Sequence, residues 1–430
     1  MSLHFINAML IDPAAGTISA GALTVAGGKI TAVTAQHVPT PKAARVIDCA
    51  GNCLAPGIVD LGVKVCEPGE RHKESYRSAG LAAAAGGVTT IITRPDTLPA
   101  IDNPETLEFV TRRANAAAPV NVVPMAALTK ERAGQEMTEI SFLIDAGAAA
   151  FTDCDHVVRD TKVFARALAY AKSLGALVIG HTQEPILSQG ACATSGKFAS
   201  LKGLPGVSQM AERLAIDRDI SLVEMTGARY HADQITTARA LPALERAKAN
   251  GLDITAGVGI HHLTLNALDI DDYRTFFKLK PPLRDDADRR AVIAAVASGL
   301  IDVVCSMHTP QDEESKRLPF EEAASGAVGL ETLLPAAMRL VQDGLIDLPT
   351  LWRALSLNPA QRLGLDAGRL SPGAPADLVL FDPDAAFVLD RTTLHSKSQN
   401  TPFDGMSLQG RVLGTYVAGN CVFERSDAPA

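Results

Sequence analysis

The pattern of hydrophobic and polar positions divides the chain into three regions. In residues 1–55, short apolar runs are separated by turn residues such as Pro13 and Gly27-Gly28, about ten residues apart. After Pro56, β-branched runs alternate with longer stretches of helical period. From Leu370 the short β-type runs return. Because the two β-rich ends flank the middle region, we expect them to pair with each other into one small β-sandwich.

The middle region contains eight strand candidates separated by helices. They span 57–65, 88–93, 120–128, 147–153, 176–181, 228–235, 253–260 and 301–307. Such regular alternation favours a closed (β/α)8 barrel of the TIM type over an open sheet, and so an α/β fold. A glycine-rich loop at 183–205 interrupts the alternation. The predicted domains are a barrel at 56–364 and a composite β-sandwich at 1–55 and 365–430.

Composition changes the predicted fold little, but it limits the classes of binding partner. The 430 residues are 47% hydrophobic, with a net charge of −8. Lysines and arginines form no block, which argues against nucleic acid or an anionic membrane as a partner. The sequence shows neither a signal peptide nor a long apolar span, and its seven cysteines lack CxxC spacing. We therefore expect a cytoplasmic protein without a disulfide framework.

The first predicted barrel strand is expected to carry candidate catalytic residues. Catalytic groups of barrel enzymes lie at the carboxyl ends of the strands. Gly62 and Lys64 alternate with Leu61 and Val63, so both belong to one face of this strand. Neither residue suits a metal ion, because a glycine offers no ligand atom and a protonated lysine repels a cation.

Several stretches, in order along nearly the whole chain, carry a family resemblance. They include Pro-Gly-Ile-Val-Asp at 56–60 and Pro-Pro-Leu-Arg at 281–284. The others are 67–69, 86–90, 128–130, 147–153, 260–264, 358–360 and 396–403. Together they resemble the long-chain bacterial dihydroorotases of the amidohydrolase superfamily. Such enzymes close or open a cyclic amide with a zinc-activated hydroxide.

The resemblance implies a metal site that is largely replaced in this chain. Gly62 and Lys64 stand where the family has its paired histidines, and Gln234 stands at the ligand position of the sixth strand. Asp153 and His181 retain the ligand types of the fourth and fifth strands. We therefore expect no metal and no other cofactor.

The resemblance also places the proton-transfer group and the substrate clamp. Met307 stands at the position of the acid/base aspartate, so no catalytic residue is expected. Family residues that hold the substrate are replaced by Cys66, Asp96, Lys280 and Gln311. Losing metal ligands, acid/base group and clamp together is typical of a vestigial pocket.

Other roles for these residues remain open. Asp153 and His181 form either a vestigial metal pair or a simple hydrogen-bonded pair. Lys64 is a carbamylated metal bridge, a Schiff-base lysine, or the partner of Asp96 or Asp153 in an ion pair. His231 is a buried strand histidine or a misaligned metal ligand. Cys66 is a nucleophile or a small buried side chain.

Three functions follow from these readings. The first is a catalytically inactive dihydroorotase homologue that self-associates and supports assembly of a dodecameric complex with the aspartate carbamoyltransferase catalytic chain, in pyrimidine biosynthesis. The second is an active zinc-dependent cyclic amide hydrolase (a dihydroorotase, or a relative of hydantoinase or allantoinase). Its metal would rest on Asp153, His181, His231 and carbamylated Lys64. The third is a sensor that binds a pyrimidine precursor through Lys64, Lys280 and Asp96 without turnover.

Overall fold

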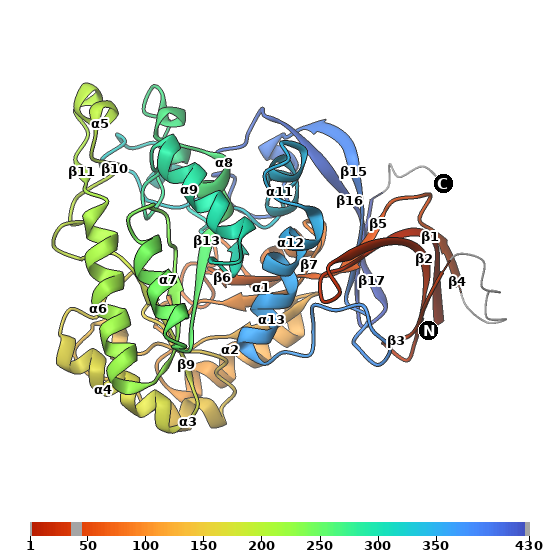
Figure 1. The fold of residues 1–430 in the computed structure, drawn as a ribbon, viewed down its shortest axis with the longest axis horizontal. Coiled ribbons are helices and arrows are strands. Elements are labelled where there is room, and N and C mark those ends of the chain that lie inside the picture. The colour runs from red at the N-terminus through yellow and green to blue at the C-terminus, as the bar shows by residue number, and fades with distance from the viewer. Residues whose placement is uncertain (1, 36–44, 426–430) are drawn as a thin grey trace.

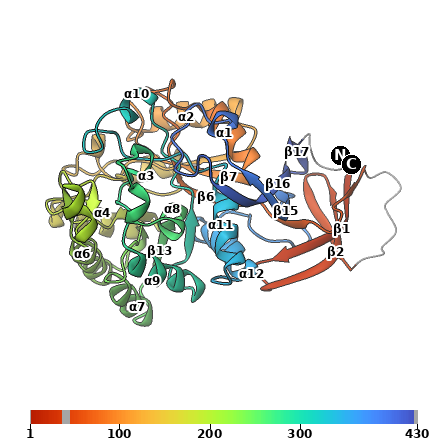
Figure 2. The ribbon, with the colours of Figure 1, turned by 90° about the horizontal axis from the view of Figure 1, so that it is seen from above.

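The computed structural model describes residues 2–35 and 45–425. Strands from the two chain ends form one eight-stranded sheet beside the barrel (Figures 1 and 2). These strands are β1 (Ser2–Asp12), β2 (Thr17–Ala26), β3 (Lys29–Thr34), β4 (Arg45–Asp48), β5 (Cys53–Pro56), β15 (Leu378–Val388), β16 (Ser407–Val417) and β17 (Asn420–Glu424). β5 joins the two ends, because it pairs in parallel with β1 and antiparallel with β15.

The sheet encloses a core of its own. Phe5 and Tyr416, from opposite ends of the chain, meet edge to face with ring centroids 5.0 Å apart. Leu23, Leu54 and Leu378 are buried in the same cluster. The pairing of the chain ends is as predicted, and the strands are continuous through one hydrogen-bonded sheet. The exact domain boundaries at 55/56 and 364/365 stay a prediction.

The middle of the chain forms the predicted barrel. Its strands are β6 (Ile58–Val63), β7 (Val88–Thr93), β8 (Asn121–Pro124), β9 (Leu177–His181), β12 (Arg229–Asp233), β13 (Ile254–Gly259) and β14 (Val303–Cys305). The fourth position is held by Phe151 alone, which bridges in parallel to Ala126 and to Val178. The barrel closes where the backbone N–H of Lys64 donates to the carbonyl of His308, 2.9 Å away.

Helices lie around this barrel. They are α1 (Tyr76–Ala85), α2 (Pro104–Ala117), α3 (Ile140–Asp145), α4 (Thr161–Ser173), α6 (Met210–Thr226), α7 (Leu241–Ala249), α8 (Ile260–Thr264), α9 (Asp286–Ala297), α10 (Glu313–Lys316), α11 (Leu333–Gln342), α12 (Leu348–Trp352) and α13 (Asn358–Leu363). Ser75, Asn103 and Asp285 each accept a backbone N–H at a helix start, which fixes where α1, α2 and α9 begin. Within the described residues, no helix is both long enough and apolar enough to cross a bilayer.

The predicted loop at 183–205 has structure of its own. It carries α5 (Lys197–Lys202) and a short parallel pair, β10 (Ala193–Thr194) with β11 (Gly206–Val207). In Figure 1 this arm stands at the edge of the barrel farthest from the sheet. Gly203, with φ +67°, takes the left-handed conformation that ends α5. A helix of six residues is too short to give a detectable period, and this is why the sequence predicted a loop.

Candidate functional site

The carboxyl ends of β6 and β14 are locked together below the barrel mouth. Asp60 is fully buried, and its Oδ1 accepts the backbone N–H of Ser306 at 2.8 Å. The Ser306 hydroxyl donates to Oδ2. Burial raises the pKa of the Asp60 carboxyl to about 6, while the hydrogen bonds from Ser306 oppose that rise. Both strands are thereby fixed in the register that brings Gly62 close to Met307.

Met307 fills the centre of the mouth. A Cβ on Gly62 would lie 3.4 Å from Met307 Sδ, and a Cβ on Gly259 would lie 3.0 Å from Met307 Cγ. The methionine side chain therefore packs against two strands that have no side chain there. Gln234 lies beside it and accepts the backbone N–H of Gly259 on Oε1 at 3.0 Å. Ordinary packing thus occupies the space between these strands.

Lys64 and Asp96 form an ion pair at this side of the mouth. Lys64 Nζ lies 3.2 Å from Asp96 Oδ2, and Arg94 donates to the same oxygen at 2.7 Å. Burial alone would raise the pKa of Asp96, yet the charges of Arg94 and Lys64 hold it below its ordinary value. Of the partners considered for Lys64, the structure shows Asp96 and not Asp153.

Asp153 and His181 are not hydrogen-bonded to each other. Asp153 Oδ1 accepts two backbone N–H groups at 3.0 Å, those of Leu128 and Thr129. Its Oδ2 accepts the Thr129 hydroxyl at 2.5 Å. His181 Nε2 has no partner within the described part of the chain. Burial lowers the pKa of the His181 imidazole to about 3, so the ring is neutral.

The residues present do not fit a zinc ion. Gly62 has no ligand atom, Lys64 is ion-paired with Asp96, and the Gln234 amide oxygen already accepts a backbone N–H. The alternative ligand His231 shares a hydrogen bond through Nδ1 with Thr255 at 2.9 Å. Across residues 2–35 and 45–425, no three His, Cys, Asp or Glu side chains are gathered as a metal requires.

Cys66 and the neighbouring histidines His261 and His262 take structural positions. Burial raises the pKa of the Cys66 thiol to about 12, so the thiolate needed for nucleophilic attack is not formed near neutral pH. His261 stacks on Phe403 with centroids 5.5 Å apart, and His262 Nε2 hydrogen-bonds the carbonyl of Pro281 at 3.0 Å. These contacts hold α8 in place.

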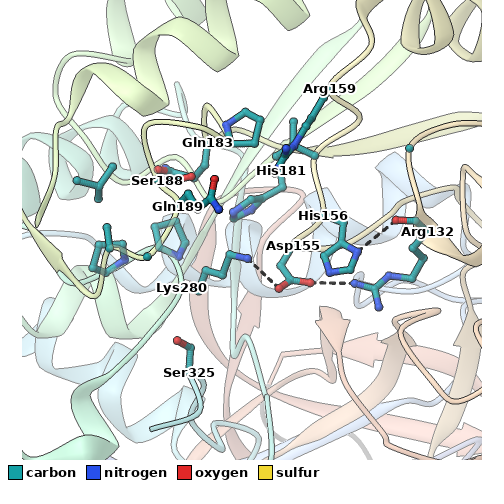
Figure 3. A pocket seen from close by; sticks show the side chains of 18 of the residues that line it. Arg132, Asp155, His156, Arg159, His181, Gln183, Ser188, Gln189, Lys280 and Ser325 are labelled. Atoms are coloured by element: carbon teal, nitrogen blue, oxygen red, sulfur yellow. Dashed lines mark hydrogen bonds and ion pairs between the residues drawn. The ribbon is translucent and has the colours of Figure 1, made fainter. Parts of the chain in front are cut away.

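The opposite side of the mouth is open. A cavity of about 820 Å³ lies between the ends of β9 and the loops near residues 132, 155, 189 and 280 (Figure 3). Lys280 and His181 line it, whereas Lys64, Asp96, Gln234, Met307 and Gln311 do not. Of the residues predicted for one pocket, His181 and Lys280 line the cavity. The closed side holds Gly62, Lys64, Asp96, Gln234 and Met307.

Asp155 is the central charged residue of the open side. Lys280 Nζ lies 3.0 Å from one carboxylate oxygen and Arg132 2.9 Å from the other, from opposite directions (Figure 3). Arg94 is 4.0 Å away. Burial opposes ionisation, but these cations lower the pKa of Asp155. Asp155 was not among the residues predicted for the site. It follows Asp153 by two residues, but Cys154 between them has φ +56° and lies in a turn, so the alternation of a strand does not indicate it.

Gln311 lies in a different network, which holds the segment 396–403. Its side-chain amide donates to the carbonyl of Ser325 at 2.9 Å, and its backbone N–H donates to Asn400 at 3.2 Å. Asn400 in turn donates to the carbonyl of Gly326 at 3.0 Å. Gln311 therefore links the segment 396–403 to the loop after β14. It contacts neither the Lys64–Asp96 nor the Lys280–Asp155 ion pair.

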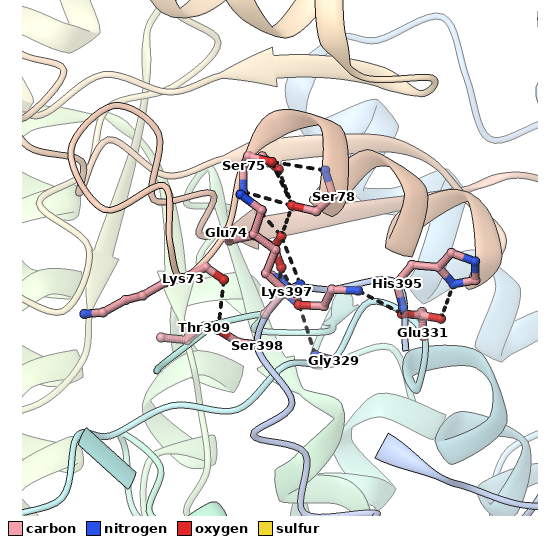
Figure 4. A network of polar contacts seen from close by, with 12 residues as sticks. Lys73, Glu74, Ser75, Ser78, Thr309, Gly329, Glu331, His395, Lys397 and Ser398 are labelled. Carbon is pink, nitrogen blue, oxygen red and sulfur yellow. Dashed lines mark hydrogen bonds and ion pairs between the residues drawn. The ribbon is translucent and has the colours of Figure 1, made fainter. Parts of the chain in front are cut away.

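Glu74 is the buried centre of that network (Figure 4). It is fully buried and accepts hydrogen bonds from His308 at 3.3 Å and from the hydroxyls of Ser78 and Ser396. His308 Nδ1 accepts the N–H of Gly329, so the ring proton is on Nε2 and faces Glu74. Burial opposes ionisation, yet the hydrogen bonds from His308, Ser396 and Ser78 lower the pKa of Glu74. The network joins α1, the end of β14 and the C-terminal segment.

Known proteins similar to the chain agree with this fold. The Dihydro-orotase-like family model matches residues 51–240, and the Amidohydrolase family model matches 322–423. A "Dihydroorotase-like protein" of Pseudomonas aeruginosa is 40% identical over 424 residues, covering 99% of this chain and all of that protein. A "Dihydroorotase" of Desulforapulum autotrophicum is 36% identical over 427 residues, with 99% and 100% covered.

Solved structures show the same architecture. The L-hydantoinase (dihydropyrimidinase) from Arthrobacter aurescens has a TM-score of 0.89 at 24% identity. The likeness covers 100% of this chain and 97% of that protein. A dihydropyrimidinase from Brevibacillus agri has a TM-score of 0.86 at 21% identity, covering 99% and 95%. At these identities the likeness concerns the fold alone.

Proposed function

The chain belongs to the dihydroorotase-like family of amidohydrolases, and from this premise we propose that it is a non-catalytic member that supports the assembly of aspartate carbamoyltransferase. One observation supports the proposal that the chain is non-catalytic. Met307 packs between Gly62 and Gly259, where the resemblance places a metal ligand and the acid/base carboxylate. A thioether neither takes up nor delivers a proton at neutral pH.

The chemistry of a cyclic amide explains why this replacement matters. Opening or closing the ring needs an activated water and a group that moves a proton at the reacting nitrogen. The closed side offers the Lys64–Asp96 ion pair and the Gln234 amide, all engaged with protein partners. These groups supply neither requirement, so we assign them a packing role.

The assembly part rests on the family resemblance and on the outer surface. Phe109 on α2 and Phe142 on α3 are 44% and 62% exposed, although most large apolar side chains are buried. α2 and α3 contact each other, so both phenylalanines belong to neighbouring helices. Exposed aromatic side chains on adjacent helices favour a protein partner. This surface is on the barrel and not on the sheet domain.

Active zinc-dependent hydrolysis is the second candidate. It is favoured by the name "Dihydroorotase" of the relative from Desulforapulum autotrophicum, which aligns over its full length. Its metal would require Asp153, His181 and His231 to converge. Asp153 would first lose its bonds from Leu128 and Thr129, and His231 its bond to Thr255.

Co-purification tests the proposal. The full chain and the aspartate carbamoyltransferase catalytic chain of the same organism are mixed, and size-exclusion chromatography with light scattering gives the mass. We expect a single complex containing both chains, and no turnover of dihydroorotate with added zinc. Separate elution contradicts the assembly role, and zinc-dependent turnover contradicts the non-catalytic role.

A matched pair of variants tests the surface. We expect Phe142→Asp, on α3, to weaken the complex. Val388→Asp is the control, because Val388 is 67% exposed but lies in the sheet domain. Equal effects of the two substitutions would contradict the assignment to α2 and α3.

A further inference from the structure

A second cavity lies away from the barrel mouth, where the barrel meets the sheet domain. Its volume is about 350 Å³, and it is bounded by α11, the end of β15, the middle of β16 and the segment 389–395. α11 and β16 lie side by side (Figure 1). They approach closely because Gly410 on β16 has no side chain, and a Cβ there would lie 2.5 Å from Met338 Cγ on α11. The volume is in the range of sites for small molecules.

Two arginines line this cavity, and each guanidinium lies over an aromatic ring. Arg411 Cζ is 5.4 Å from the centroid of the Phe387 ring, and Arg425 Cζ is 5.4 Å from that of the Phe423 ring. Arg425 also donates through Nε to the carbonyl of Val412 at 2.9 Å. No carboxylate of the described residues forms an ion pair with Arg411. Each arginine therefore brings a positive charge to the cavity wall.

His395 adds a third cationic group beside Arg425. Its ring meets the Phe423 ring edge to face, with centroids 6.0 Å apart, so the same phenylalanine contacts both side chains. His395 Nδ1 lies 2.9 Å from Glu331 Oε2 (Figure 4). This hydrogen bond raises the pKa of His395 above its ordinary value, although burial and the charge of Arg425 oppose the rise. Because Nδ1 donates to the carboxylate, Nε2 is the ring atom left for another partner.

The two carboxylates in the cavity wall leave this positive charge uncompensated. Glu331 is paired with the His395 ring and also accepts the backbone N–H of His395 at 2.6 Å. Asp390 accepts the backbone N–H and the hydroxyl of Thr392. Asp390 is also exposed, so solvent screens its charge. Among the side chains that line the cavity, positive charge is therefore in excess, which favours an anion.

We propose that this cavity binds a small phosphomonoester, with its phosphate group at Arg411, Arg425 and His395. The phosphate has three terminal oxygens, which matches three cationic donors, and arginine binds such a group through two parallel hydrogen bonds. The organic group lies against the apolar part of the wall, which includes Leu389 and Leu394. The site is separate from the barrel mouth and does not depend on the proposed function. Since α11 belongs to the barrel and β16 to the sheet domain, the ligand contacts both.

Calorimetry on the full chain tests the site with phenyl phosphate, inorganic phosphate and phenol. We expect one phenyl phosphate per chain, bound about tenfold more tightly than inorganic phosphate, because its ring buries apolar surface. Phenol, which lacks the charge, should bind far more weakly than either anion. Equal affinities of the two anions would overturn the choice of a phosphomonoester over free phosphate. Phenol binding as tightly as phenyl phosphate, or no binding of either anion, would overturn the site.

A matched pair of arginine variants locates the binding. Arg411→Gln should weaken phenyl phosphate about tenfold or more, because it removes a charged hydrogen-bond donor. Arg112→Gln is the control. Arg112 also lies over a ring, with its Cζ 6.0 Å from the centroid of Phe109, but it is on α2 and outside the cavity. Thermal unfolding verifies that both variants fold. Unchanged affinity in Arg411→Gln, or equal losses in the two variants, would overturn the assignment.

An NMR titration of His395 gives a second readout in the unaltered chain. A bound phosphate should raise the pKa of His395 further, because a neighbouring anion favours the imidazolium form. The variant His395→Gln identifies the resonance by its loss. A pKa of His395 that saturating phenyl phosphate leaves unchanged would overturn the placement of the phosphate group beside this ring.

Discussion

Two Lys–Asp ion pairs lie at the barrel mouth, and they differ mainly in burial. Lys64–Asp96 has an N–O distance of 3.2 Å, and Lys280–Asp155 one of 3.0 Å. The Lys64 side chain is 17% exposed and that of Lys280 is 46% exposed. The first pair belongs to the side closed by Met307, and the second borders the cavity. The same chemical pair therefore fills space on one side and presents charge to solvent on the other.

Under the proposed non-catalytic function, the two sides of the barrel mouth have changed to different extents. On the closed side, packing and paired charges occupy the centre. On the open side, His181 Nε2 and Gln183 Oε1 have no hydrogen-bond partner among the described residues, and a cavity of about 820 Å³ remains. On this proposal, the catalytic groups can be lost while the cavity is kept, because the two depend on different strands of one barrel.

The largest expected effect lies beneath the closed side, at Glu74. Glu74→Ala leaves His308 and two serine hydroxyls without their acceptor in a fully buried site. We expect the free energy of unfolding to fall by about 3–5 kcal/mol. Guanidinium denaturation followed by circular dichroism measures this. Glu136→Ala is the control, because its ion pair with Lys130 is exposed to solvent and contributes little to stability. Similar midpoints for the two variants would refute a supporting role for Glu74.

The pH dependence of stability tests the burial of the Asp60 carboxyl beneath the closed side. Burial raises its folded-state pKa from 3.8 to about 6. The protonated form is thus favoured in the folded chain, and the stability it contributes is full below about pH 4 and lost as pH rises to about 6. The shift of about two pH units corresponds to about 3 kcal/mol. Asp60→Asn should therefore gain stability relative to the unaltered chain between pH 4 and pH 7. Parallel stability curves would contradict the burial of a charged carboxyl here.

Overpacking tests whether the closed side is really full. A Cβ at Gly259 would lie 3.0 Å from Met307 Cγ and from Gln234 Oε1. We expect Gly259→Ala to cost about 1–3 kcal/mol and Gly259→Ala with Met307→Ala to recover part of that cost. Thermal unfolding measures both. Gly196→Ala is the control, since no atom of the described residues lies within 4 Å of a Cβ at that position. Strict additivity of the two substitutions would show that Met307 does not occupy this space.

The smallest expected effect comes from the two lysines themselves. Lys64→Met removes one cation from buried Asp96, which keeps Arg94, and we expect a loss of about 1–2 kcal/mol. Lys280→Met should change stability by less than about 0.5 kcal/mol, because its pair is half-exposed. Urea denaturation of both variants checks the contrast. Equal losses would remove the distinction between the closed side and the open side.

The fold could be predicted from the sequence because its signals are periodic. Eight apolar runs alternating with helices specify a barrel, and the β-rich ends specify a joint sheet. The structure of the arm at 183–205 was not predicted, because α5 is too short to show a helical period and β10 and β11 pair over two residues each. Phe151 joins the barrel by isolated bridges alone, which no local pattern indicates.

The candidate site was predictable only in part. The ion pair of Lys64 with Asp96 was one of several alternatives, since the sequence cannot give the side-chain distance. Gln311 was assigned to the pocket, but its contacts are with Ser325 and Asn400, because the loop after β14 turns toward the segment 396–403. The Gln183 side chain donates to Glu212, 29 residues away in the chain, and only the folded structure brings the two together.

Zinc stoichiometry is the most direct test of the central claim, that side chains occupy the family's metal position. The full chain is incubated with zinc, dialysed and analysed by inductively coupled plasma mass spectrometry, alongside His181→Ala. We predict well below one zinc per chain and no difference between the two proteins. One zinc per chain that is lost in His181→Ala would contradict the account, and it would establish a metal centre that the packing of Met307 and Gln234 excludes.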